Sequence, residues 1–98
     1  MVIERADISV ISGREAEFES IMEEGCALLS GASGCISVSL MRCVERPSRY
    51  FLQIGWGSLA DHQAFTKTPD FQTFKDIVGP FFNERPVTEH FQLVSPPC

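Results

Sequence analysis

The sequence is short of positive charge, of long apolar runs and of histidine. Eight Lys and Arg residues stand against 13 acidic ones, which gives a net charge of −5. The basic residues are scattered, which argues against a nucleic-acid partner. No apolar run approaches the roughly 20 residues that span a bilayer. Residues Glu4 and Arg5 interrupt the start of the chain, so no signal peptide is predicted there. We therefore expect a cytoplasmic protein without a membrane partner.

Metal-ligand motifs, phosphate-binding loops and paired cysteines are also missing. The four cysteines include no C-x-x-C pair, and no His lies at a ligand-like offset from them. Cys35 and Cys43 fall on one predicted strand, where eight residues span roughly 26 Å. A disulfide needs Cα atoms within about 7 Å. We expect reduced thiols, no metal and no cofactor. The cysteines are Cys26, Cys35, Cys43 and Cys98.

What the sequence does have is a regular alternation of patterns along 98 residues, enough for one domain covering 1–98. Period-two patterns predict strands at 2–11, 35–44, 49–56 and 86–94, with a tail at 95–98. Helical spacing predicts an amphipathic helix from Arg14 that ends at Gly31 and Gly34. The strand at 49–56 is apolar on both faces, which indicates that both faces are covered.

Two capping signatures predict the helices of the second half. Ser58 and Asp61 begin a short helix that reaches about Lys67, because a serine hydroxyl can accept from a first-turn N–H. Thr68 and Pro69 then start another helix, with Thr as the cap and Pro at the first position. This second helix is limited by Gly-Pro at positions 79 and 80.

The predicted order is β-α-β-β-α-β, a ferredoxin-like α+β fold with a four-stranded antiparallel sheet and the helices on one face. We expect the helix-free face to be apolar. A chain of this length buries only about 60–70 % of its unfolded surface. Two sheets are therefore expected to stack in a homodimer. The space between sheet and helices is the expected small-molecule pocket.

Candidate site residues concentrate between Trp56 and Phe82. His62 and His90 can act as general bases near neutral pH, or can serve only as packing and hydrogen-bonding groups. Trp56 can stack on a planar ligand or belong to the core. Asp7 can serve the site or pair with Arg5. Other possible pocket residues, each with a core role as the alternative, are Phe65, Phe71, Phe74, Phe81, Phe82 and Tyr50.

The segment W-x-S-L-x-D-H-x-x-F-x-x-[ST]-P-x-F from Trp56, with P-x-x-E-H-F at 86–91, resembles the antibiotic biosynthesis monooxygenase family of dimeric α+β barrels. The resemblance implies a fold that hosts cofactor-free oxygenases forming quinones from polycyclic phenols, haem-degrading oxygenases and polyketide cyclases. Many quinone-forming members carry a His nine or ten residues after the Trp, where this chain has Phe65 and Thr66. The haem-degrading branch uses a first-strand Asn and an iron-ligating His that this chain lacks, so haem degradation is not expected.

These observations lead to one main hypothesis and two rivals. The main one is a cofactor-independent monooxygenase that acts on an aromatic polyketide-type phenol. His62 or His90 is its expected base, and the expected substrate-binding residues are Trp56, Phe65, Phe74, Phe81, Tyr50 and Asp7. The rivals are a cyclase or isomerase that uses the same base without O2, and a non-catalytic dimeric module that binds a small ligand.

Overall fold

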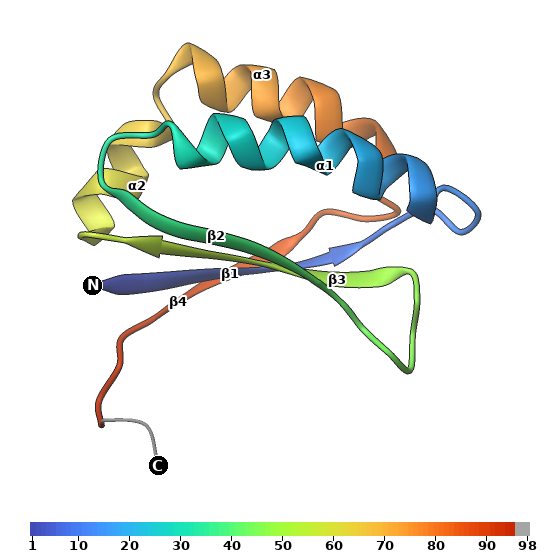
Figure 1. Cartoon of the computed structure of the whole chain (residues 1–98), viewed down its shortest axis with the longest axis horizontal. Helices are drawn as coiled ribbons and strands as arrows, with labels where there is room; N and C mark the ends of the chain where they lie inside the picture. Colours follow the sequence, from blue (N-terminus) through green and yellow to red (C-terminus); the bar gives the residue numbers. More distant parts are fainter. Residues whose placement is uncertain (96–98) are drawn as a thin grey trace.

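A computed structural model describes residues 1–95 as a single four-stranded antiparallel sheet with the helices packed on one face (Figure 1). The strands lie in the order β2-β3-β1-β4. The expected ferredoxin-like order is confirmed, with the second helical region divided into two helices. The elements are β1 (Val2–Ser9), α1 (Glu15–Ser30), β2 (Cys35–Arg42), β3 (Arg49–Trp56), α2 (Leu59–Phe65), α3 (Pro69–Val78), the 3-10 turn η1 (Gly79–Phe81) and β4 (Val87–Phe91).

Three predicted strands end earlier than expected, and β2 ends at Arg42 instead of position 44. After Ser9, β1 stops pairing, and Val10 makes only an isolated bridge with Phe82. β4 was predicted to reach position 94 but ends at Phe91, opposite Ile3 of β1. Because β1 begins at Val2, almost none of it is left to pair with β4 beyond Phe91. Of the predicted tail, positions 96–98 with Cys98 lie outside the described residues.

The predicted caps place α2 and α3. The Ser58 hydroxyl accepts from the Asp61 N–H at 3.2 Å, and the Thr68 hydroxyl accepts from the Phe71 N–H at 3.3 Å. Both helices therefore begin where the sequence indicated. The turn after α1 depends on Gly34, whose φ is +82°. A Cβ there would clash with the Asp61 side chain, so only glycine lets this turn approach α2.

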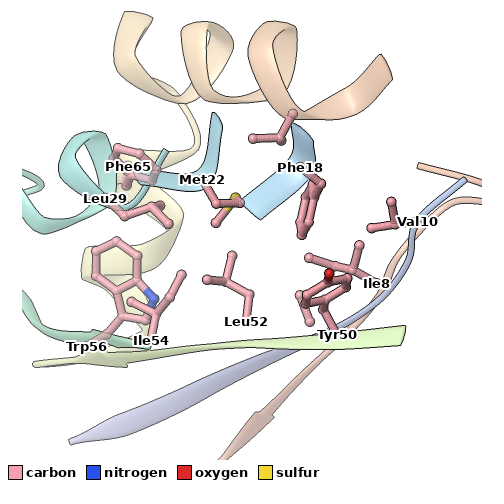
Figure 2. Close-up of a cluster of buried hydrophobic side chains, with 12 residues drawn as sticks. Ile8, Val10, Phe18, Met22, Leu29, Tyr50, Leu52, Ile54, Trp56 and Phe65 are labelled. Atoms are coloured by element: carbon pink, nitrogen blue, oxygen red, sulfur yellow. The ribbon is translucent and has the colours of Figure 1, made fainter. Parts of the chain in front are cut away.

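The core lies between the inner face of the sheet and the helices. Figure 2 shows Tyr50, Leu52, Ile54 and Trp56 of β3 rising toward α1. Alternate residues of a strand point to the same face, which is why these four positions share one layer. From α1, Phe18 packs against Tyr50 with ring centroids 4.9 Å apart. Trp56 and Phe18 have no exposed surface, so both belong to this core.

The helix-free face of the sheet is not the apolar surface that the sequence suggested. β3 presents Arg49, Phe51 and Gln53 there, so only its inner face is uniformly apolar. Arg49 donates to both carboxylate oxygens of Asp7, at 3.0 and 2.8 Å. The expected pairing of Asp7 with Arg5 is thus replaced, and the Arg5 guanidinium instead lies 4.3 Å from the centre of the Phe51 ring. Among the described residues, no helix is long and apolar enough to cross a membrane.

Candidate functional site

A cavity of about 340 Å³ lies between the inner face of the sheet and the three helices. Its volume is within the range of small-molecule sites. Most of its wall is aliphatic or aromatic, and its polar groups gather at Glu4 and His62 and at a few further side chains. The lining residues are Glu4, Ala6, Ile8, Met22, Leu29, Leu52, Ile54, Trp56, His62, Phe65, Thr66, Phe71, Phe74, Lys75, Val78, Phe82, Arg85, Pro86 and Thr88.

Glu4 is the buried charge of this cavity, with only 8 % of its surface exposed. It occupies an inward position of β1, between Ile54 of β3 and His90 of β4 in the strand register. Its Oε1 accepts a hydrogen bond from Trp56 Nε1 at 2.9 Å. A buried carboxylate is costly unless it is paired, and the indole N–H supplies part of that pairing.

His62 lies on α2, one turn after the Ser58 cap, and its ring lies flat against Trp56. The two ring centroids are 5.3 Å apart with an interplanar angle of 18°. His62 Nε2 lies 3.3 Å from Oε1 of Glu4, so the same carboxylate oxygen contacts both the indole and the imidazole. Trp56 at the end of β3 therefore covers one face of the imidazole, and Glu4 of β1 contacts its edge.

His90 completes the group from the edge strand β4. Its Nε2 lies 2.7 Å from Nδ1 of His62, a hydrogen-bonding distance whose donor depends on the tautomers. His90 is exposed and is not among the cavity-lining residues, whereas His62 is half-buried and lines the cavity. The arrangement is a chain from Trp56 through Glu4 and His62 to His90, running from the buried end of the cavity to the surface.

The surroundings of His62 act on its protonation in opposite directions. Burial lowers its pKa below the ordinary value of about 6.5, and the neighbouring His90 adds to that effect. The Glu4 carboxylate works against both, because a negative charge stabilises the imidazolium. The net result is a lowered pKa, so the His62 imidazole is a neutral proton acceptor at pH 7.

The structure brings together several of the expected site residues and separates others. Trp56, Phe65 and Phe74 line the cavity, and so does Phe71. Phe81 does not: it packs near Phe18 under the Arg14 guanidinium, and its neighbour Phe82 lines the cavity instead. η1 ends at Phe81, and the extended backbone resumes at Phe82.

Tyr50 and Asp7 also lie away from the cavity, which corrects their expected role in it. The buried Tyr50 hydroxyl donates to Oε2 of Glu19 at 2.5 Å. Burial, with the charge of Glu19, raises the pKa of Tyr50 to about 12, so this hydroxyl is a structural donor. Asp7 lies on the opposite face of the sheet, bound to Arg49, which holds the pKa of its carboxyl below the ordinary value.

Glu4 is the polar cavity residue that the sequence reasoning missed. It breaks an otherwise apolar inward row, which consists of Val2, Ala6 and Ile8 of β1 and of Val10 just after the strand. A charged residue at an inward position of a strand is a signal for a paired or functional group.

The fold also gathers a cluster that sequence spacing did not indicate. One ligand-type atom from each of Glu4, His62 and His90 lies within 4.8 Å of the other two. The sequence was expected to hold no metal site, because its cysteines form no C-x-x-C pair and no His lies at a ligand-like offset from them. Cys26, Cys35 and Cys43 are free thiols, and burial raises the pKa of Cys26 and Cys35. Cys98 falls outside the described residues.

Comparison with known proteins identifies the family. The family model for antibiotic biosynthesis monooxygenases matches residues 1–77. The uncharacterized protein YczJ of Bacillus subtilis (strain 168) is 35 % identical over 95 residues, which cover 96 % of this chain and all of that protein. A crystal structure from Bordetella bronchiseptica that carries the same family name has a TM-score of 0.91 and 38 % identity, covering 96 % of this chain and 97 % of that one.

A crystallised mutant of SnoaB, a cofactor-independent oxygenase from Streptomyces nogalater, superposes with a TM-score of 0.85. It is 18 % identical, over 97 % of this chain and 94 % of that one, so the likeness to SnoaB shows the shared fold alone. The family-model match and the relatives above 30 % identity carry the assignment. The chain belongs to the antibiotic biosynthesis monooxygenase family.

Proposed function

We propose that this protein is a cofactor-independent monooxygenase that oxidises an aromatic polyketide-type phenol in the sheet–helix cavity. One observation supports this most directly. An imidazole, that of His62, borders a cavity with largely apolar walls, and it is backed by a buried carboxylate and bonded to a second imidazole that reaches the surface. Family membership is consistent with this activity, although one fold can host several chemistries.

His62 is the proposed base. The Nε2–H of His62 faces the Glu4 carboxylate 3.3 Å away, so Nδ1 is the basic nitrogen. A substrate hydroxyl that displaces the exposed His90 from Nδ1 transfers its proton there, and the Glu4 carboxylate stabilises the imidazolium that forms. When His90 returns, Nδ1 passes this proton to His90 Nε2 across 2.7 Å. The exposed His90 then releases a proton to solvent. In this scheme His62 contacts the substrate and His90 returns His62 to its neutral form.

The oxidation follows from the phenolate. Loss of the proton makes the aromatic ring electron-rich, and the ring then supplies all four electrons that reduce O2. One atom of O2 becomes the new carbonyl oxygen in place of a C–H hydrogen, and the other leaves as water. A phenol plus O2 thus gives a quinone plus H2O. The apolar walls keep bulk water away from the anion, and Lys75 and Arg85, which also line the cavity, offer positive charge to it.

The test is oxygen consumption on addition of an anthrone-type phenol, with the quinone product identified by absorbance and mass. Replacing a general base typically lowers kcat by about 10²–10⁴-fold. We expect a loss in that range for His62→Gln and a smaller one for His90→Gln. Gln63→Ala is the matched control, because Gln63 is an exposed neighbour on the same helix. Full activity in both histidine variants would refute the base assignment.

The same assay separates the two rival functions. Product that forms equally well without O2 would indicate a cyclase or isomerase that uses His62 as its base. Saturable ligand binding with no product, with or without O2, would indicate a non-catalytic binding module.

We also propose that the protein is a homodimer that pairs through the helix-free face of the sheet. In the described residues no helix covers this face, which carries exposed Phe91 and Met41 beside Phe51. The Arg5 guanidinium there lies against the rings of Phe51 and Phe91. Light scattering at micromolar concentration should give twice the mass of one chain. A stable monomer would exclude this arrangement.

A further inference from the structure

We infer that His62 and His90 also form a binding site for a divalent transition-metal ion of the Zn²⁺ or Ni²⁺ type, with Glu4 as the carboxylate that orients His62. This site goes beyond the proposed oxygenase activity, which uses no metal. Imidazole nitrogens are the ligands that these ions favour. The two rings come from different elements, α2 and β4, and their facing nitrogens are 2.7 Å apart.

The spacing of the two nitrogens suits a shared ion after a small adjustment. Ligand bonds of about 2.0–2.1 Å place two nitrogens about 2.9 Å apart at a right angle and about 3.4 Å apart at a tetrahedral angle. The observed 2.7 Å therefore has to open by about 0.2 Å for the right angle and by about 0.7 Å for the tetrahedral one. His90 can supply that movement, because it is exposed and lies on the edge strand.

Glu4 supplies the outer support that metal-bound histidines usually have. Its Oε1 lies 3.3 Å from Nε2 of His62, the nitrogen on the far side of the ring from His90. A proton on Nε2 facing the carboxylate leaves the lone pair of Nδ1 free for the ion. His90 then holds its proton on Nδ1 and offers Nε2. Both rings remain neutral, no net proton is released, and the remaining coordination positions are open to water.

The inference has a consequence for catalysis that rests on the proposed function. The ion would occupy Nδ1 of His62 and Nε2 of His90, the two nitrogens between which the proton is passed. Zn²⁺ is therefore expected to inhibit the oxygenase, and a chelator is expected to restore it.

The experiment is calorimetric titration of the EDTA-treated, dialysed protein with Zn²⁺ and, separately, Ni²⁺, without substrate. We expect saturable binding of one ion per chain. His90→Gln, at an exposed position that tolerates change, should weaken binding by at least tenfold. Glu4→Gln should weaken it about 10–100-fold, as is typical when the carboxylate behind a metal-bound histidine is removed. Circular dichroism of each variant checks that the fold is intact.

Cysteine thiolates also bind these ions, so a matched control is required. Cys35 is the appropriate one, because its thiol is close enough to Glu4 for that charge to raise its pKa. Cys35→Ser should leave binding unchanged. The inference is overturned if no saturable binding occurs, if His90→Gln binds as well as the wild type, or if Cys35→Ser abolishes binding. The titration contains no substrate, so a lack of metal binding would overturn only the metal site and not the oxygenase proposal. A lack of oxygenase activity would likewise not affect the metal-binding result.

Discussion

The hydrogen bond between Trp56 and Glu4 should contribute measurably to the stability of the fold. Trp56 has no exposed surface and Glu4 is 8 % exposed, so neither group can exchange its partner for water. The donor–acceptor distance is 2.9 Å. The perturbation is a double-mutant cycle of Glu4→Ala, Trp56→Phe and the two together. Glu4→Ala leaves the indole N–H without a partner, and Trp56→Phe leaves the carboxylate without its indole donor.

The expected coupling free energy follows from the charge of the acceptor, the Glu4 carboxylate. A hydrogen bond to a charged group contributes about 1.5–3 kcal/mol net, and the cycle should return a coupling free energy in that range. Each single variant should lose at least this much in the free energy of unfolding. Trp56→Phe should lose more, because the smaller ring also leaves space against His62. For a domain of this size, a loss of about 1.5 kcal/mol lowers Tm by about 6 °C or more.

The assay is urea unfolding followed by far-ultraviolet circular dichroism, since Trp56→Phe removes the only tryptophan of the chain. All variants are compared at one protein concentration, because association would add to the apparent stability. Glu24→Ala, at an exposed position of α1, is the control and should change stability by less than about 0.5 kcal/mol. A coupling free energy below about 0.5 kcal/mol would refute the assigned role of the Trp56–Glu4 bond.

Two further predictions concern the turn before β2 and the outer face of the sheet. Gly34→Ala should destabilise the fold by more than the roughly 1–2 kcal/mol that a left-handed backbone costs a non-glycine residue, because its Cβ also meets Asp61. Gly13→Ala, with φ +93° and open space around the Cβ, should lose only that backbone cost. Equal losses of unfolding free energy in urea for the two variants would disprove the contact between Cβ and Asp61. Asp7→Asn should cost at most about 1 kcal/mol at pH 7. Arg49 lowers the pKa of Asp7 in the folded state, so this stabilisation exists above the ordinary pKa of about 4 and is lost as the pH falls through the lower folded value. Unfolding at pH 7 and pH 2.5 should show the difference from wild type shrinking in acid, and a constant difference would contradict the ion pair.

Local patterns were enough to predict the order of the elements and the starts of two helices. Ser58 and Thr68 cap their helices because the relevant N–H groups are three residues away, a spacing that is local to the chain. The alternation of β3 likewise identifies its inner residues. The shortened ends of β1 and β4 could not be foreseen, because strand length depends on where the partner strand stops.

The candidate site depended on contacts that no local pattern encodes. His62 and His90 are 28 residues apart, and they meet only because β4 pairs with β1 while α2 packs over the end of β3. Glu4 was visible as a charged residue in an apolar row, yet its partner Trp56 is 52 residues away. Phe81 and Phe82 illustrate the opposite difficulty: two identical side chains in succession give no sign of which one turns toward the cavity.

The position of His90 on β4 ties the chemistry of the site to the local stability of one short strand. β4 has five residues and pairs only with β1, so it can open without disturbing the core beneath α1 and α3. Each such opening would withdraw the second imidazole while Trp56, Glu4 and His62 stay in place. The free energy of this opening, measurable by amide hydrogen exchange at residues 87–91, then sets the fraction of time for which the two-histidine site exists.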